Sequence, residues 1–131
     1  MADTRRPLSP HLQIYKWQVQ MVTSILHRAT GIALAVGTLM ILWGLLSLAA
    51  GEDAYNQFKI CSGSPIGVIL MIGWTWALFY HLCNGIRHLI QDAGTGYAIP
   101  QFVRSSWLSI IVSIVLTLLV WAYVLTAGGA A

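Results

Sequence analysis

The run GIALAVGTLMILWGLLSLAAG, residues 31–51, decides the fold, because none of its side chains is charged. A helix of about 20 apolar residues, rising about 1.5 Å per residue, spans the roughly 30 Å hydrocarbon core of a bilayer. The whole chain of 131 residues is 57% hydrophobic and only 8% charged. A soluble domain carries about 25% charged residues. The composition therefore predicts an integral membrane protein in a lipid bilayer.

Two more segments of the same kind follow this run. The second opens at Ser64-Pro65, where proline suits the first helical turn, and ends near Asp92 before the turn residues 93–96. The third is the uncharged run of residues 105–126. We expect residues 51–63 to form a short polar loop and Pro100 to lie in a loop. The prediction is one all-α membrane-anchor domain over residues 1–131, with an arm at 1–20 and a bundle of three transmembrane helices at about 21–50, 64–92 and 104–127.

The basic residues predict the orientation of this bundle. Four Lys or Arg residues lie in the arm and the segment up to Arg28, and two lie in the connection from Arg87 to Arg104. The connection at 51–63 has only Lys59, beside two acidic residues. An odd number of spans places the two basic regions on the same side. By the positive-inside rule, the N-terminus is then cytoplasmic, or on the matrix side in a mitochondrion.

Several kinds of partner and processing are not indicated by the sequence. A net charge of +3, scattered along the chain, gives no reason to expect nucleic acid. The first residues, MADTRRPLSPHL, have no apolar core beside a cleavage site, so no signal peptide is expected. No Arg/Ser-rich transit segment is apparent either, which favours a bacterial inner membrane over a mitochondrial one. Cys61 and Cys83 have no metal-ligand spacing and are interpreted as small buried apolar residues.

The segment YHLCNGIRHLIQD, residues 80–92, brings polar side chains to the end of the second span. As a helix it puts His81, Gly85, His88 and Asp92 on one face. Polar groups inside a span are expensive, and a neutral imidazole is a good iron ligand. Glycine one turn from His81 would let a large flat group approach the backbone. We therefore interpret His81 as an axial haem ligand; the alternative is a structural histidine bonded to a carbonyl group.

The sixth ligand of such an iron has to come from elsewhere. His81 and His88 cannot both ligate one iron from the same side, and His27 is too near the interface. A partner subunit is the more economical source, which predicts that the chain does not act alone. We expect the polar residues at the start of the first span and those at the end of the second span to lie on the same side of the membrane. The reason is that the first span starts on the side where the second span ends.

The segment WQVQMVTSILHR, residues 17–28, carries a second candidate site. A quinone headgroup needs hydrogen bonds at its carbonyls, a cation near its reduced forms and apolar walls. Ser24 and Arg28 would supply the first two, and Trp17, Met21 and Ile25 the walls. The alternative is an interfacial arginine that reaches lipid headgroups beside a tryptophan anchor.

The segments RPLSPHLQIY (6–15), SILHRATG (24–31) and HLCNGIRHLIQD (81–92) resemble the signature segments of the cytochrome b subunit of succinate dehydrogenase, the larger membrane anchor of respiratory complex II. The resemblance extends over essentially the whole chain. It implies one haem b shared with a second anchor subunit, with His81 as the ligand from this chain. It also implies a ubiquinone site with Ser24 and Arg28 as contacts and Trp17, Met21 and Ile25 as its apolar wall.

The same resemblance implies further roles and partners. His27, Arg28 and His88 would neighbour the haem propionates, and Asp92 would dock the iron–sulfur subunit or deliver protons. The partners would be the second anchor, the iron–sulfur subunit and the flavoprotein, which oxidises succinate. This chain has neither a flavin fingerprint nor a cysteine set for an iron–sulfur cluster, so it would be a non-catalytic anchor and electron-transfer subunit. Two alternatives stay open: an anchor of a fumarate reductase or another haem b complex, and a structural or assembly membrane protein without a cofactor.

Overall fold

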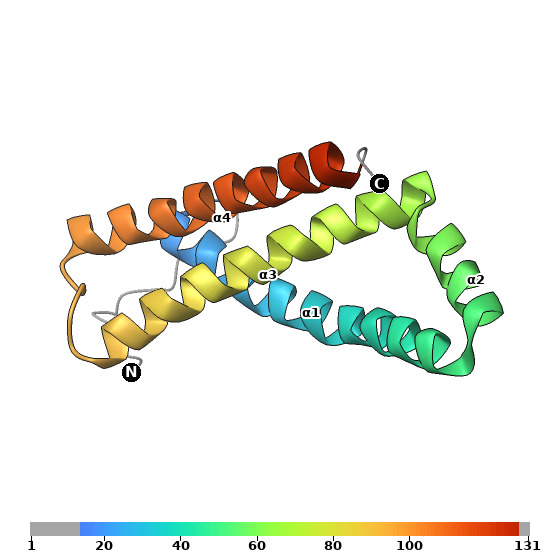
Figure 1. The fold of residues 1–131 in the computed structure, drawn as a ribbon. Helices are drawn as coiled ribbons and strands as arrows, with labels where there is room; N and C mark the ends of the chain where they lie inside the picture. Colours follow the sequence, from blue (N-terminus) through green and yellow to red (C-terminus); the bar gives the residue numbers. More distant parts are fainter. Residues whose placement is uncertain (1–13, 129–131) are drawn as a thin grey trace, which may run out of the picture.

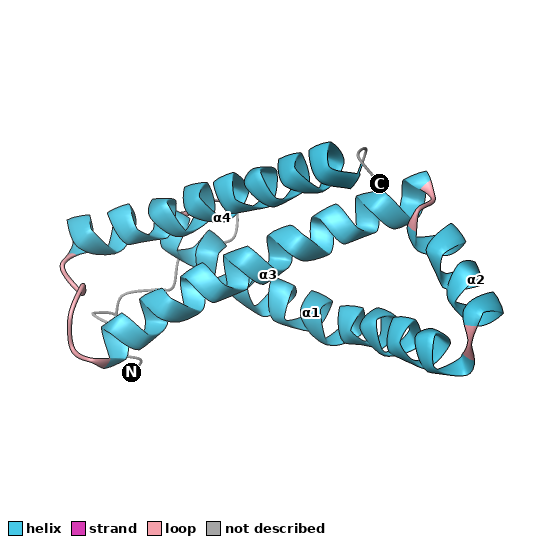
Figure 2. Cartoon of the chain, in the orientation of Figure 1, coloured by secondary structure: helices cyan, strands magenta, loops and turns pink. Residues whose placement is uncertain are grey.

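The structure, a computed structural model, describes residues 14–128, and these residues form four helices and no strand. In chain order they are α1 (Val19–Ala50), α2 (Glu52–Ser62), α3 (Pro65–Asp92) and α4 (Ile99–Ala127) (Figures 1 and 2). Helices α1, α3 and α4 are long and apolar enough to cross a membrane. The predicted class, an all-α bundle of three membrane-spanning helices, is confirmed. Residues 1–13 of the expected polar arm lie outside the described part, and the sidedness of the N-terminus stays a prediction.

Residues 51–63, expected to be a loop, contain the 11-residue helix α2, so that prediction was wrong. Gly51 ends α1 with φ 120°, a backbone conformation that side chains disfavour. The acidic pair Glu52 and Asp53 then opens α2, and Lys59 lies in its last turn, the charge order that a helix dipole favours. Cys61 on this helix is exposed, contrary to the expectation that it is buried, and both cysteines are free.

Helix α3 begins as its sequence predicts. The side-chain oxygen of Ser64 accepts a hydrogen bond from the backbone N–H of Gly67 at 3.1 Å, and Pro65 occupies the first turn. An N-cap of this kind contributes about 1 kcal/mol to helix stability. At the other end, Gly94 and Gly96 adopt positive φ angles of 84° and 81° and turn the chain toward α4.

Helix α4 begins earlier than the sequence indicated. It starts at Ile99, so Pro100 lies in its first turn and not in a loop. Proline is tolerated there because the first N–H groups of a helix have no acceptor within the helix. The extra turns bring Phe102 and Arg104 onto the helix, ahead of the uncharged run at 105–126.

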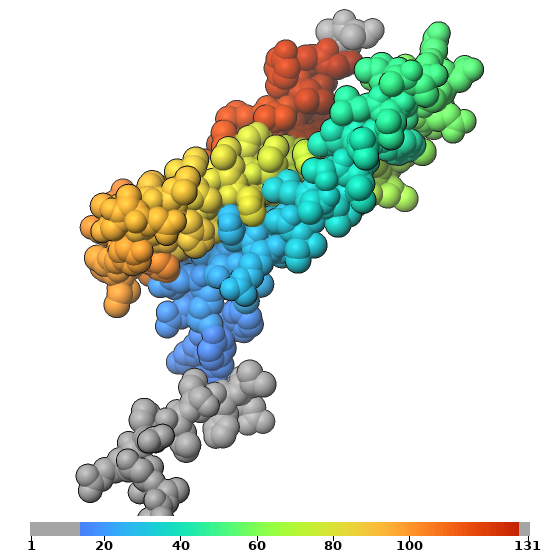
Figure 3. All heavy atoms as spheres, turned by 90° about the horizontal axis from the view of Figure 1, so that it is seen from below, coloured from blue at the N-terminus to red at the C-terminus, as the bar shows by residue number. Residues whose placement is uncertain are grey.

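Helix α3 lies between the other two long helices. Its second half packs against the start of α1, and α4 runs alongside α3 and also contacts α1 (Figures 1 and 3). Toward the other end α1 and α3 diverge, and α2 links them (Figure 1). An apolar cavity of about 1040 Å³ lies in this diverging half, lined in part by Gly37, Phe58, Trp74 and Trp121.

Small hydroxyl side chains fill the interior, whereas large apolar side chains face outward. Leu39 on α1 and Leu118 on α4, for example, are 65% and 64% exposed, as expected for surfaces that meet lipid. The hydroxyl groups of α4 that face the interior donate to carbonyls of their own helix, at 2.7–3.0 Å. Small residues of this kind let helix backbones approach closely. These buried residues are Ser106, Ser109, Ser113 and Thr117.

Candidate functional site

Three histidines from two helices meet where α1 and α3 pack. The rings of His27 on α1 and His81 on α3 are stacked, with centroids 4.0 Å apart and planes within 10°. The ring of His88, two turns further along α3, lies 5.3 Å from that of His27. Residues more than fifty positions apart in the sequence are thus brought to one end of the bundle. Because His81 lies beside His27, it also lies at the level of Arg28.

The imidazole of His81 is held through its Nδ1 atom. This atom lies 3.2 Å from the backbone carbonyl oxygen of His27 and 3.3 Å from the hydroxyl oxygen of Thr30. A carbonyl oxygen can only accept a hydrogen bond, so Nδ1 carries the ring proton. In the neutral form of the ring, Nε2 then keeps a lone pair. A metal-ligating histidine commonly donates its other ring N–H to a carbonyl in this way.

A glycine of α1 allows this close approach of α1 and α3. A Cβ atom at Gly31 would lie 3.1 Å from Cε1 of His81, closer than nearly all real contacts of this kind. On the facing helix, a Cβ at Gly85 would lie 4.0 Å from Cε1 of His27, an ordinary contact. The glycine of the SILHRATG segment therefore has a steric role. At Gly85 a Cβ atom would fit without any shift, so this contact with His27 does not require glycine.

The residues at this end fit a haem group. His81 offers Nε2 as a neutral ligand from a ring whose orientation is fixed. Within residues 14–128, Nδ1 of His27 is buried and has no hydrogen-bond partner. An orphaned buried nitrogen of this kind indicates a partner beyond the described residues, such as a water molecule or an ion. His88 and Arg28 are exposed at the same end and could reach the propionates of a haem.

The candidate quinone residues lie on a part of α1 that its own chain leaves uncovered. Ser24, Ile25 and Arg28 are exposed, and Met21 is partly buried. Trp17 is not part of this helical stripe, because α1 starts at Val19 and Gln18 before it is extended. The ring of Trp17 packs edge-on against Tyr15 at 5.9 Å, and the Tyr15 hydroxyl lies 3.1 Å from Sδ of Met21. The two apolar residues are thus linked by Tyr15.

The buried stripe of α3 is a different one from the stripe singled out in the sequence. The stripe named from the sequence includes His81, which is partly buried, and His88 and Asp92, which are exposed. The buried stripe is displaced by one residue along the helix. Periodicity gives the spacing of a face but not the direction in which that face points. The buried residues are Ala77, Tyr80, Asn84, Arg87 and Gln91.

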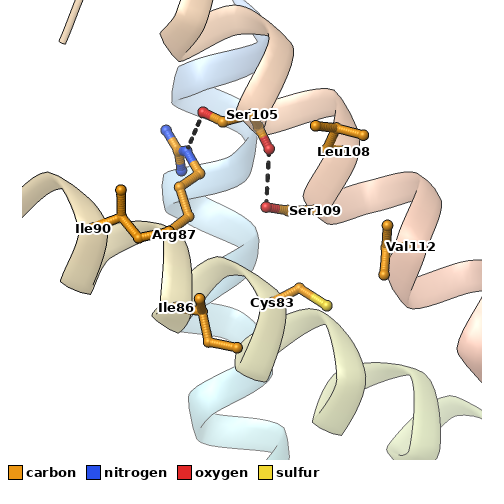
Figure 4. A pocket seen from close by; sticks show the side chains of 8 residues that line it. All are labelled: Cys83, Ile86, Arg87, Ile90, Ser105, Leu108, Ser109 and Val112. Atoms are coloured by element: carbon orange, nitrogen blue, oxygen red, sulfur yellow. Dashed lines mark hydrogen bonds between the residues drawn. The ribbon is translucent and has the colours of Figure 1, made fainter. Parts of the chain in front are cut away.

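Arg87 is the buried cation of this stripe, with 6% of its surface exposed. Its Nε donates to the hydroxyl of Ser105 at 3.1 Å (Figure 4). Its Nη1 donates to Oδ1 of Asn84 at 2.7 Å. The guanidinium also lies over the ring of Phe102, 4.5 Å from its centroid. A groove of about 260 Å³ between α3 and α4 borders these groups, with Cys83 in its wall (Figure 4). Arg87 therefore ties α3 to α4 near the histidines.

Comparison with known sequences identifies the family of the chain. Residues 2–120 match the model of a family described as "Succinate dehydrogenase/Fumarate reductase transmembrane subunit". The chain belongs to this family of membrane subunits. A succinate dehydrogenase cytochrome b556 subunit of Rickettsia felis is 44% identical over 117 residues, which cover 89% of this chain and 91% of the relative.

Two more members of the succinate dehydrogenase/fumarate reductase transmembrane family are similarly close. The cytochrome b556 subunit of Paracoccus denitrificans succinate dehydrogenase is 43% identical over 122 residues, covering 91% of this chain and 94% of the relative. The mitochondrial cytochrome b560 subunit of Mus musculus succinate dehydrogenase is 40% identical over 131 residues, covering 98% of this chain and 72% of the relative. The family assigned from the three sequence segments is thereby confirmed.

Proposed function

We propose that the chain is the cytochrome b anchor subunit of a succinate dehydrogenase. In this proposal it shares a haem b with a second anchor subunit and forms part of the ubiquinone-reducing site. Succinate oxidation takes place on the flavoprotein, and the iron–sulfur subunit passes the electrons to the membrane. The bacterial relatives favour a bacterial inner membrane as the location. The three relatives described above are named as succinate dehydrogenase subunits, which favours this enzyme over a fumarate reductase.

The observation that carries the proposal is the position of His81. Its Nδ1 lies 3.2 Å from the carbonyl oxygen of His27, the residue that directly precedes Arg28. A single packing contact thus joins a candidate iron ligand to the helix that carries the candidate quinone residues. A bound haem would supply a one-electron redox centre here. Of the residues of this chain, His81 would hold the iron, and His27, Arg28 and His88 would meet the propionates.

The quinone residues act on the headgroup by charge and hydrogen bonding. Ser24 donates from its hydroxyl to a quinone carbonyl oxygen, and the Arg28 guanidinium favours the negative charge that reduction places there. Met21 and Ile25, with Trp17 beyond the start of the helix, exclude water from the ring and tail. Because Trp17 and Ile25 are exposed on this chain and Met21 is only partly buried, the other wall comes from the iron–sulfur subunit and the second anchor.

A reduced-minus-oxidised visible spectrum of the purified membrane complex tests the haem assignment. We expect a b-type haem band in the wild type and its loss in His81→Leu, because leucine offers no ligand. Removal of the second anchor subunit should also abolish the band. A band that persists in His81→Leu contradicts the ligand assignment, and a wild-type complex without a haem band indicates an anchor or assembly protein without a cofactor.

Quinone-reductase assays test the second half of the proposal. Arg28→Leu should keep the haem band but lower kcat/KM for quinone about 10-fold or more, because a charge-assisted hydrogen bond contributes about 1.5–3 kcal/mol. Ser24→Ala should lower it by about 5-fold, as expected for a neutral hydrogen bond of about 1 kcal/mol. The matched control is Arg104→Leu, which removes another exposed arginine, on α4. Wild-type quinone kinetics in both Ser24→Ala and Arg28→Leu would refute the proposed site.

A further inference from the structure

We propose that Thr30 is a positioning residue for the haem ligand: its hydroxyl oxygen accepts from Nδ1–H of His81 and thereby helps to set the redox potential of the iron. This inference depends on the proposed function, because it needs haem at His81. It assigns to Thr30 a role that neither periodicity nor residue type indicated.

The hydroxyl of Thr30 is oriented by its own helix. Its oxygen lies 2.8 Å from the carbonyl oxygen of Leu26 and 3.1 Å from that of His27, so it donates its single proton to these groups. The lone pairs of the hydroxyl oxygen are then free to accept from Nδ1–H of His81 at 3.3 Å. Thr30 is 4% exposed, so water cannot readily replace this contact.

Two acceptors from α1 therefore converge on one ring nitrogen of α3. The carbonyl oxygen of His27 lies 3.2 Å from Nδ1 and the hydroxyl oxygen of Thr30 lies 3.3 Å from it. The missing side chain at Gly31 leaves room for Cε1 of His81, and the ring of His27 is stacked on the imidazole. Together these contacts fix both the tautomer and the rotation of the ring.

A hydrogen bond at Nδ1 changes the electronic character of Nε2. Donation from Nδ1–H makes the imidazole a more basic ligand, and a more basic ligand stabilises the oxidised iron. Loss of one of the two acceptors should therefore raise the midpoint potential of the haem. It should also alter the ring orientation that the iron experiences, because only the backbone acceptor of His27 would be left.

Three variants of the whole complex separate this role from a structural one. Thr30→Val removes the oxygen while keeping the branched shape, and Thr30→Ser keeps the hydroxyl. Thr23→Val is the matched control, because Thr23 is also buried on α1 and its hydroxyl bonds to a carbonyl of its own helix, that of Gln20 at 3.0 Å. The readouts are the haem midpoint potential from a redox titration and the low-spin EPR spectrum of the oxidised complex.

We expect a raised potential and a changed EPR spectrum in Thr30→Val, with wild-type values in Thr30→Ser and Thr23→Val. Wild-type values in Thr30→Val, or an equal shift in Thr23→Val, would overturn the inference. If Thr30→Val fails to assemble, Thr30→Ala removes the same oxygen without adding bulk and is measured in its place. Failure of the proposed function looks different: the wild type then lacks haem, or His81→Leu retains it.

Discussion

The hydroxyl of Tyr80 donates to the backbone carbonyl oxygen of Thr23 at 2.8 Å, and this hydrogen bond joins α3 to α1 directly beside both candidate sites. Tyr80 precedes His81, and Thr23 precedes Ser24. Both bonded residues are fully buried. The bond therefore fixes the relative height of the two helices at the position where the haem ligand and the quinone residues meet.

Tyr80→Phe removes this bond without changing the shape of the ring. A neutral hydrogen bond contributes about 1 kcal/mol, so we expect a lower thermal midpoint of the solubilised complex. The control is Tyr123→Phe on α4, where the side chain is 71% exposed. An unchanged midpoint in Tyr80→Phe would show that this bond adds nothing to the stability of the contact between the two helices.

Gly31→Ala should disturb the haem rather than the helix. Alanine favours helix more than glycine does, but its Cβ would lie 3.1 Å from Cε1 of His81. The ring has to shift, so we expect a changed visible spectrum or lower haem content. Gly73→Ala on α3 is the control, because a Cβ there meets nothing within 4 Å. Identical spectra in the two variants would contradict the close approach at Gly31.

Gly37→Ala acts on the same helix, about three turns from His27. A Cβ at Gly37 would overlap the indole of Trp74, so that ring must move or α1 must move away from α3. Overpacking of this kind costs about 1–3 kcal/mol. We expect a lower thermal midpoint in a complex whose haem spectrum is close to wild type. A haem spectrum as disturbed as that of Gly31→Ala would indicate that the contacts at Gly31 and Gly37 are not independent.

Arg87→Lys tests the buried guanidinium. Lysine cannot donate to Ser105 and Asn84 in the same fork or stack in the same way on Phe102. We expect a destabilisation of about 1–3 kcal/mol, since buried polar partners lose their donor. Arg104→Lys, at an exposed arginine of α4, should stay within about 0.5 kcal/mol of wild type. Equal stability of the two variants would show that the contacts of Arg87 do not stabilise the packing of α3 against α4.

Much of the fold follows from where charges are missing. The uncharged runs predicted the three long helices, and Ser64-Pro65 predicted the start of α3 because capping chemistry is local. Helix α2 was missed because its polar composition resembles that of a loop. Pro100 was read as a loop residue although the first turn of a helix accepts proline equally well.

The site could be predicted in its residue types but not in its contacts. His81 and His27 were named from the sequence, yet their stacking and the bond from Nδ1 depend on how α1 and α3 cross. Thr30 was not named as a site residue from the sequence, because a threonine in a membrane helix ordinarily bonds to its own backbone, as it does here. Only the position of α3 shows that the hydroxyl oxygen of Thr30 also contacts Nδ1 of His81.

Helix α4 is attached to α3 by two side-chain bonds about 24 Å apart along its axis. One joins Arg87 to Ser105 at 3.1 Å, and the other joins the indole of Trp121 to the hydroxyl of Thr75 at 3.3 Å. The buried hydroxyls between these two bonds donate to carbonyls of α4 itself and therefore do not hold α3. If one of these two hydrogen bonds is removed, α4 can rotate about the other. Loss of either hydrogen bond should therefore appear as a tilt of α4 relative to α3 and not as detachment of α4.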